Sequence, residues 1–311
     1  MISDDTEHTL LVAQSLLAHP DDAAAFGRSL ARHLRWWFLA LPAGVGLATA
    51  RACLKLWLGF PPDRSGVFSA GNGPAMRSAI LGAYFCAAPD LVERYVTAST
   101  RLTHTDPRAL TGALAVARLA AWAVRHDPAE LPSAEFLGDL LTKLAPADQE
   151  WAGLVDLMRT AWQSEASVPA FASSLGLADG VTGYVYHTVP VAVYAWRRHY
   201  GDFRAAVEAA LDCGGDSDTV GAIVGALAGA TVGGDGIPAD WITGINDWPR
   251  SLGFLRSVAA RLSNQRRDGR PQGPVSYFWP GVLPRNLIFL IIVLLHGFRR
   301  LAPPYEPPKR E

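Results

Sequence analysis

Apolar residues recur with helical spacing along almost the whole chain. The segments DDTEHTLLVAQSLLAH, PRALTGALAVARLAAWAVR and WPRSLGFLRSVAARL place apolar positions three or four residues apart, on one face of a helix. No stretch shows the convincing two-residue alternation of a half-buried strand. Breaks fall at Pro20 with Asp21, at Pro61 with Pro62, and at GGDGIP after Val232. The pattern predicts an all-α fold.

Nearly every predicted helix has an apolar face, and no long linker separates them. The 311 residues are 50% hydrophobic, enough to bury a sizeable core. We therefore expect one compact domain over residues 1–300, followed by a Pro-rich tail over residues 301–311.

Charge and cysteine content narrow the class of protein. The formal net charge is -1 with 18% charged residues, which gives no basic field for nucleic acid, so no nucleic-acid partner is predicted. Cys53, Cys86 and Cys213 are scattered, without the paired spacing of a zinc or redox site. The acidic start MISDDTEHTL does not resemble an export signal. These features favour the cytoplasm.

The segment NLIFLIIVLLHGF contains nine unbroken apolar residues, Leu287 to Leu295, about half of what a membrane span requires. We expect a buried helix. The alternative is a helix lying on a membrane surface over residues 287–300, with Arg299 and Arg300 at the headgroups.

A cluster of oxygen-bearing side chains occurs in LDCGGDSDTVGAIVGALAGA. Asp216, Asp218 and Thr219 follow a Gly-Gly turn and begin a helix of small residues. One aspartate would suffice to cap that helix, whereas two with a threonine suit magnesium, manganese or calcium. An EF-hand is excluded because its twelfth position is Leu227. A phosphatase-type DSDTV motif is disfavoured because it should follow a strand, and here a helix precedes it.

A second cluster begins the sequence, where SDDTEHTLLVAQSLL places Ser3, Asp4 and Asp5 at the start of the first predicted helix. Read alone, Asp4 with Glu7 three residues later indicates a capping box. A metal would need further anionic ligands beyond one cluster, so the two clusters together raise the possibility of a shared site.

The two clusters resemble the paired metal motifs of the ADP-ribosylglycohydrolase family. The resemblance continues in order through SAGNGPAMRSAILGAYF, LTHTDPRALTGALAVA, GYVYHTVPVAVYAW and GIPADW, so it covers residues 3–241. The family includes dinitrogenase-reductase-activating glycohydrolases and ADP-ribosylarginine and ADP-ribosylserine hydrolases. It implies a compact orthogonal multi-helix bundle, in agreement with the helical periodicity.

The resemblance also implies a site. It assigns two Mg²⁺ or Mn²⁺ ions to Ser3, Asp4, Asp5, Asp216, Asp218 and Thr219. It places Gly71, Asn72 and Gly73 on a loop around the ribose and diphosphate, His104 on the adenosine side, and Tyr184, Thr188 and Pro190 in a segment that lines the substrate. We further expect Met76 and Arg77 to begin a helix whose N-terminus favours an anion.

The activity implied is hydrolysis of the bond between the ribose anomeric carbon and an acceptor such as a protein side chain. Asp4 and Asp5 are the predicted proton-handling groups, and an ADP-ribosylated protein or a small ADP-ribose conjugate is the predicted partner. The alternative is a non-catalytic relative that binds ADP-ribose or has a structural role. The retained Asp5, Asp216 and Asp218 favour the enzyme.

The sequence departs from the family pattern in two places. Members carry a Gly-Asp-rich segment before the first acidic motif, so we expect either that Met1 is an internal methionine or that the member is degenerate. A motif starting at Ser3 is also expected to lie on a frayed terminus. The insertion-like run over residues 32–66 is rich in Trp and Leu and is read as extra core, or else as a lid or partner surface. Residues 261–273 are expected to form a basic loop.

Overall fold

The computed structural model describes residues 1–301, with side chains through Arg299. Within this range the protein is built from helices, and no strand is formed beyond three isolated bridge pairs. The helices are α1 (Asp4–Ala18), α2 (Ala23–Leu39), α3 (Leu47–Trp57), α4 (Gly73–Met76), α5 (Ala79–Tyr84), α6 (Pro89–Arg101), α7 (Pro107–Ala123), α8 (Ala134–Thr142), α9 (Gln149–Gln163), α10 (Val168–Ser174), α11 (Val185–Arg198), α12 (Phe203–Leu211), α13 (Ser217–Val232), α14 (Ala239–Gly244), α15 (Leu252–Asp268) and α16 (Val282–Leu301), with short 3-10 turns η1 (Pro62–Arg64), η2 (Gly234–Gly236) and η3 (Trp279–Gly281). The all-α prediction is confirmed.

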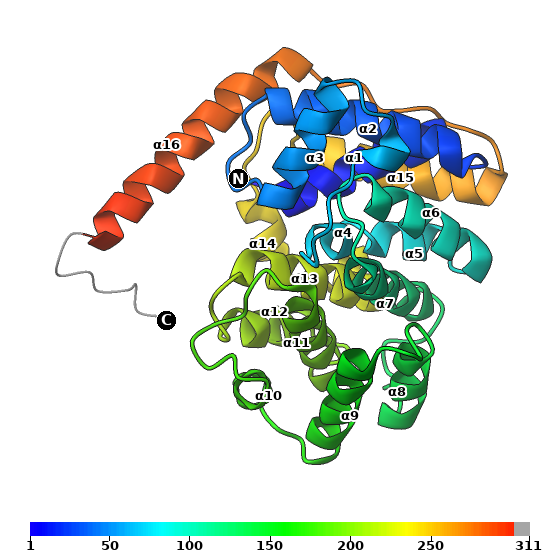
Figure 1. Ribbon diagram of the computed structural model, residues 1–311, viewed down its shortest axis with the longest axis vertical. Coiled ribbons are helices and arrows are strands. Elements are labelled where there is room, and N and C mark those ends of the chain that lie inside the picture. Colours follow the sequence, from blue (N-terminus) through cyan, green and yellow to red (C-terminus); the bar gives the residue numbers. More distant parts are fainter. Residues whose placement is uncertain (302–311) are drawn as a thin grey trace.

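Two hydrophobic clusters meet on α7. One is formed mainly by α8 to α13, and the other by α1, α2, α3, α6 and α15. In Figure 1 the first group of helices forms the lower part of the molecule and the second group the upper part. Val116 and Leu119 of α7 belong to the first cluster, and Leu114 and Ala117 to the second. Because one rigid helix serves both cores, the two ends of the molecule are held in a fixed relation.

The N-terminal residues are tied to distant parts of the chain and do not fray. Ile2 is 7% exposed. Its backbone N–H donates to Oδ2 of Asp247 at 2.9 Å, and its carbonyl accepts from Nη2 of Arg285 at 2.5 Å. The expectation of a frayed start is therefore wrong, because residues far along the chain close over this segment.

Two expectations about the C-terminal region are also wrong. α15 continues to Asp268, so the basic stretch from residue 261 is largely helical. α16, expected to be buried, has most of its apolar side chains exposed, including Leu287, Ile291 and Leu295. In Figure 1 it extends away from the rest of the molecule. Residues 302–311, most of the predicted tail, lie outside the described residues, and the single domain over 1–300 stays a prediction.

The contact between α5 and α7 depends on a glycine. A Cβ added at Gly82 would lie 1.8 Å from the carbonyl oxygen of Ala117, an overlap with backbone that side-chain movement cannot relieve. Gly82 therefore sets how closely the two helices approach.

We predict that Gly82→Ala destabilises the fold by about 3 kcal/mol, because α5 must move away from α7 and disturb both cores. Chemical denaturation would measure the change. Gly153→Ala is the matched control, since Gly153 lies inside α9 with nothing within 4 Å of an added Cβ. It should be neutral or slightly stabilising. Equal effects of the two changes would contradict this account of the α5–α7 contact.

Candidate metal centre and ligand cleft

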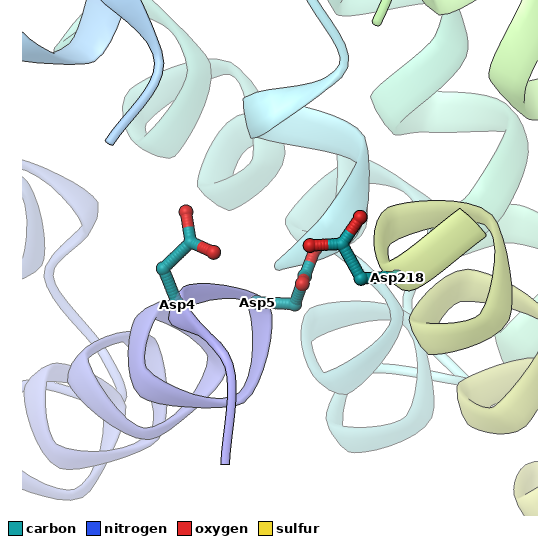
Figure 2. A group of neighbouring side chains, drawn as sticks. All are labelled: Asp4, Asp5 and Asp218. Carbon is teal, nitrogen blue, oxygen red and sulfur yellow. The ribbon is translucent and has the colours of Figure 1, made fainter. Parts of the chain in front are cut away.

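Three carboxylates from the two ends of the sequence converge. Asp4 and Asp5 lie in the first turn of α1, and Asp218 lies in the first turn of α13 (Figure 2). One oxygen from each lies within 4.8 Å of the others. Both helices direct their N-termini, the positive ends of their dipoles, to this point, which favours negative charge. The arrangement brings together the two acidic clusters as the sequence predicted.

Helix capping does not account for these acids. Neither Ser3, the N-cap of α1, nor Asp216, the N-cap of α13, makes a side-chain capping hydrogen bond. The predicted capping box of Asp4 with Glu7 is wrong, because the Glu7 carboxylate binds Arg250 and Arg285 instead. The acids are thus available for another role.

Asp5 is the most enclosed of the acids, with 1% of its surface exposed. Its Oδ2 accepts a hydrogen bond from Oγ of Ser3 at 2.7 Å. Its Oδ1 is buried and has no hydrogen-bond partner among the described residues. A buried carboxylate oxygen without a partner is costly unless a proton or a cation satisfies it.

Asp216 is positioned by its neighbours. Its Oδ2 accepts from Nδ2 of Asn72 at 2.6 Å, and the same amide donates to Oγ1 of Thr188 at 3.0 Å. The preceding turn needs glycine, because Gly215 has φ +73° and a Cβ there would lie 2.1 Å from the Val181 carbonyl oxygen. Asn72, predicted to contact ligand, and Thr188, predicted as lining, therefore also orient a predicted metal ligand.

The acids raise one another's pKa. Burial, reinforced by the charges of Asp5 and Asp218, raises the pKa of Asp4 to about 8. Burial is also the main cause of the raised pKa values of Asp5 and Asp216. Clustered carboxylates with hard oxygens and one unsatisfied oxygen fit a divalent cation such as Mg²⁺ or Mn²⁺, which would relieve both burial and repulsion.

A cleft of about 320 Å³ opens over the acids. Its walls come from six parts of the chain: Asp4; Gly44, Gly46, Leu47, Ala48 and Thr49; Ser69, Gly71, Asn72, Gly73 and Met76; His104; Gly183; and Asp216, Asp218 and Thr219. Most of the predicted ligand residues are thus gathered in one cleft with the predicted metal ligands.

His104 forms a neutral wall of this cleft. A Cβ on Gly71 would lie 3.0 Å from Nε2 of His104, and one on Gly73 would lie 3.3 Å from its Cε1. Burial, together with the charge of Arg77, lowers the pKa of His104 to about 3, so the ring is uncharged at neutral pH. Nδ1 lies 2.9 Å from Oγ1 of Thr103, which fixes the ring. The two glycines are needed because the ring fills the space beside them.

Arg77 does not serve an anion site at a helix start, so that expectation is wrong. The helix begins at Gly73, and Arg77 is the C-cap of this four-residue helix. Its guanidinium is completely buried and binds Ser99, Thr103 and His8. Burial without a carboxylate partner in these contacts lowers its pKa to about 10. Arg77 supports the cleft from behind through Thr103.

Tyr184 is placed beside the cleft and is not among its lining residues. Its backbone pairs with Gly71 in an isolated bridge. Its hydroxyl donates to Oε1 of Glu150 at 2.7 Å and accepts from Nη1 of Arg108 at 3.3 Å. The backbone of Tyr184 therefore holds the glycine loop. Its hydroxyl bonds the partly exposed side chains of Arg108 and Glu150.

Sequence reasoning missed one wall of the cleft. Gly44, Gly46, Leu47 and Thr49 belong to the insertion-like run over residues 32–66, which the sequence predicts to be extra core, or else a lid or partner surface. The only local signal is the loop PAGVG, whose two glycines interrupt an otherwise apolar stretch.

The chain matches a known family over most of its length. The family profile described as ADP-ribosylglycohydrolase matches residues 1–272. A protein of Archaeoglobus fulgidus named "Uncharacterized protein" is 32% identical over 263 residues, 84% of this chain and 79% of that protein. The ADP-ribosyl-[dinitrogen reductase] glycohydrolase of Rhodospirillum rubrum is 27% identical, over 78% of this chain and 72% of that protein.

Two further matches agree. The ADP-ribosylhydrolase ARH3 of Gallus gallus is 25% identical, over 77% of this chain and 72% of that protein. A solved structure described as an ADP-ribosylglycohydrolase-related protein complex superposes with a TM-score of 0.60 and 28% identity, covering 86% of this chain and 82% of the other. The comparisons of sequence and of structure thus identify proteins of the same kind.

The raised pKa values generate a pH prediction. A carboxyl group whose pKa is higher in the folded chain stabilises the fold when protonated, and that contribution is lost as pH rises. Without divalent ions, we expect the unfolding temperature to fall as pH rises. The fall begins near pH 4, about the pKa of a carboxyl group in the unfolded chain, and continues to about pH 8, the pKa of Asp4 in the folded protein. Mg²⁺ or Mn²⁺ should raise it, with a larger increment at higher pH.

The matched variant is Asp218→Asn, which removes one of the converging charges at an exposed position. We expect it to stabilise the metal-free protein at pH 8 and to abolish the metal-dependent increment. Thermal unfolding with and without each ion would measure both effects. An unchanged increment in Asp218→Asn would show that the ions act elsewhere.

Proposed function

This chain belongs to the ADP-ribosylglycohydrolase family, and on that premise we propose that it hydrolyses the bond between ADP-ribose and an acceptor with the help of divalent metal ions. Members of the family are glycosidic-bond hydrolases. The observation that carries the proposal is the convergence of Asp4, Asp5 and Asp218 at a cleft that also contains the glycine loop and His104.

The proposed ligand set for two Mg²⁺ or Mn²⁺ ions is Ser3, Asp4, Asp5, Asp216, Asp218 and Thr219. When bound, such ions supply Lewis acidity, orient ribose hydroxyls and lower the pKa of water. The chain's own contribution is to fix the ligands: Ser3 holds Asp5, and Asn72 holds Asp216.

The proposed reaction forms a bond between a water oxygen and the ribose anomeric carbon, and breaks the bond from that carbon to the acceptor nitrogen or oxygen. One proton leaves the attacking water, and the departing acceptor gains one. Asp4 is the first candidate for this proton transfer because its carboxylate lines the cleft beside the converging acids. Asp5 is the second candidate for the same role.

The remaining cleft suits the rest of ADP-ribose. Gly71 and Gly73 allow a ligand to approach the backbone closely, as a diphosphate requires. The neutral ring of His104 and the side chains of Met76 and Leu47 offer apolar surface to an adenosine group.

The proposed partner is an ADP-ribosylated protein or a small ADP-ribose conjugate, met in the cytoplasm. The lining of the cleft includes exposed residues, among them Gly44, Gly46 and Asp218, so the cleft is open to solvent and an acceptor can lie outside it. The three buried free cysteines support a reducing compartment.

The test is release of ADP-ribose from ADP-ribosylarginine and ADP-ribosylserine proteins and from small conjugates, with Mg²⁺ or Mn²⁺. We expect turnover that depends on the ion, and a loss of about a hundredfold or more in Asp218→Ala. Asp218 is exposed, so this variant should fold.

Asp235→Ala is the control, because Asp235 is an exposed aspartate on η2 outside the cleft. It should keep full activity. Binding of ADP-ribose by calorimetry without turnover of any substrate would contradict the hydrolase and favour a binding protein. Equal loss in both variants would argue against a role for the acidic cluster.

A further inference from the structure

α16 presents a long apolar surface that the folded chain leaves uncovered. Of the 18 most apolar consecutive residues in the segment Trp279–Arg299, only 22% are buried. The exposed apolar side chains are Leu287, Ile288, Leu290, Ile291, Ile292, Val293, Leu294, Leu295 and Phe298. A core helix would be mostly buried, so packing within this chain does not explain the composition of α16.

The exposed apolar residues surround the helix. The run from residue 290 to 295 is exposed at every position, and six consecutive residues exceed a full turn of about 3.6 residues. A groove in a protein partner, or a second copy of this helix, covers only one stripe. A helix that is apolar on all sides is typical of an environment that is itself apolar on all sides.

We infer that residues 287–298 of α16 insert among the acyl chains of one leaflet of a lipid bilayer and hold the protein at a membrane surface. The sequence from Asn286 to Phe298 contains no Lys, Arg, Asp or Glu, and Arg299 and Arg300 follow at once. Such an apolar segment followed by a basic pair suits acyl chains and anionic headgroups respectively.

The buried start of α16 limits how the helix inserts. By length and composition the helix over Trp279–Arg299 could cross a membrane. Arg285 and Asn286, however, are 4% and 0% exposed and bind inside the body of the protein. The free part therefore begins at Leu287, and its twelve residues extend about 18 Å, less than the roughly 30 Å of a bilayer core. A segment of this length does not cross the bilayer core; lying along one leaflet, it keeps both its base and Arg299 at the level of the headgroups.

Aromatic side chains surround the base of α16. The rings of Trp36 and Trp279 meet at 5.4 Å, and those of Trp36 and Trp57 at 5.7 Å, with each tryptophan at least 37% exposed. The Arg35 guanidinium lies 4.5 Å from the Trp57 ring. Exposed tryptophans next to a basic side chain are typical of the boundary between headgroups and acyl chains. The membrane surface thus extends from α16 onto α2 and α3.

The experiment is flotation of the full chain with vesicles of phosphatidylcholine, alone or with phosphatidylglycerol as the anionic lipid. We expect the protein to float with both, and more strongly with the anionic vesicles. Ile291→Glu/Leu295→Glu places two charges on exposed positions one turn apart, and should reduce flotation about tenfold or more. Quenching of tryptophan fluorescence by brominated acyl chains should fall in the same variant.

Leu131→Glu/Leu157→Glu is the control, because both leucines are exposed, at 56% and 44%. Leu157 lies on α9 and Leu131 shortly before α8, and Figure 1 draws these two helices at the end of the molecule away from α16. The control should float like the unmodified protein. Absence of flotation on both kinds of vesicle, or equal flotation of the two double variants, would overturn the inference. So would a dimer by light scattering that Ile291→Glu/Leu295→Glu dissociates in a protein that does not float, since a second copy would then cover α16.

Discussion

The position of the first turn of α1 depends on a buried group of four charges. Glu7 binds Arg250 and Arg285, and Asp247 binds Arg285 and the backbone of Ile2, all from residues that are at most 8% exposed. Two acids and two arginines leave the group neutral, which makes burial tolerable, whereas loss of one partner from such a group typically costs about 3–5 kcal/mol. Asp4 and Asp5 precede Glu7 by less than one turn. The network therefore holds two carboxylates in place against the repulsion of Asp218.

The acidic centre lies where the two hydrophobic clusters meet. α1 packs in one cluster and α13 in the other, and each contributes its N-terminus to the centre. α7, which belongs to both clusters, fixes the distance between them. A site assembled from two halves in this way is as rigid as the cores behind it, and rigidity is what a preorganised metal site needs. Asn72 adds a direct link, because its amide binds Asp216 of one half from the loop that also lines the cleft.

The sequence predicted the helices and the two acidic clusters because both depend on local pattern: apolar spacing for the helices, and clustered oxygens after a turn for the acids. The sequence predictions failed where contacts with distant parts of the chain determine the role of a side chain. Glu7 sits at a capping-box position, yet the arginines that take its carboxylate lie more than 240 residues away. Arg77 is predicted to begin a helix at an anion site, yet it is buried, and its neutral partners Ser99 and Thr103 carry no charge that a sequence pattern could pair with it. Periodicity also cannot distinguish a buried apolar helix from an exposed one, which is why α16 was misjudged.

The insertion-like run connects the cleft with the surface at the base of α16. Its Gly44 and its residues 46–49 line the cleft, and its Trp36 and Trp57 belong to the aromatic group beside Trp279. α3 joins the two regions. Leu47 at its first turn lines the cleft, Leu54 is exposed further along the helix, and Trp57 at its end belongs to the tryptophan group. The helix is 11 residues long, about 16 Å at 1.5 Å per residue. A bilayer that holds α16 would therefore lie within about two helix diameters of the cleft. Packing within the chain does not explain the exposed leucines of α3. They are consistent with this placement, because α3 forms one wall of the cleft at its first turn and meets lipid at its other end.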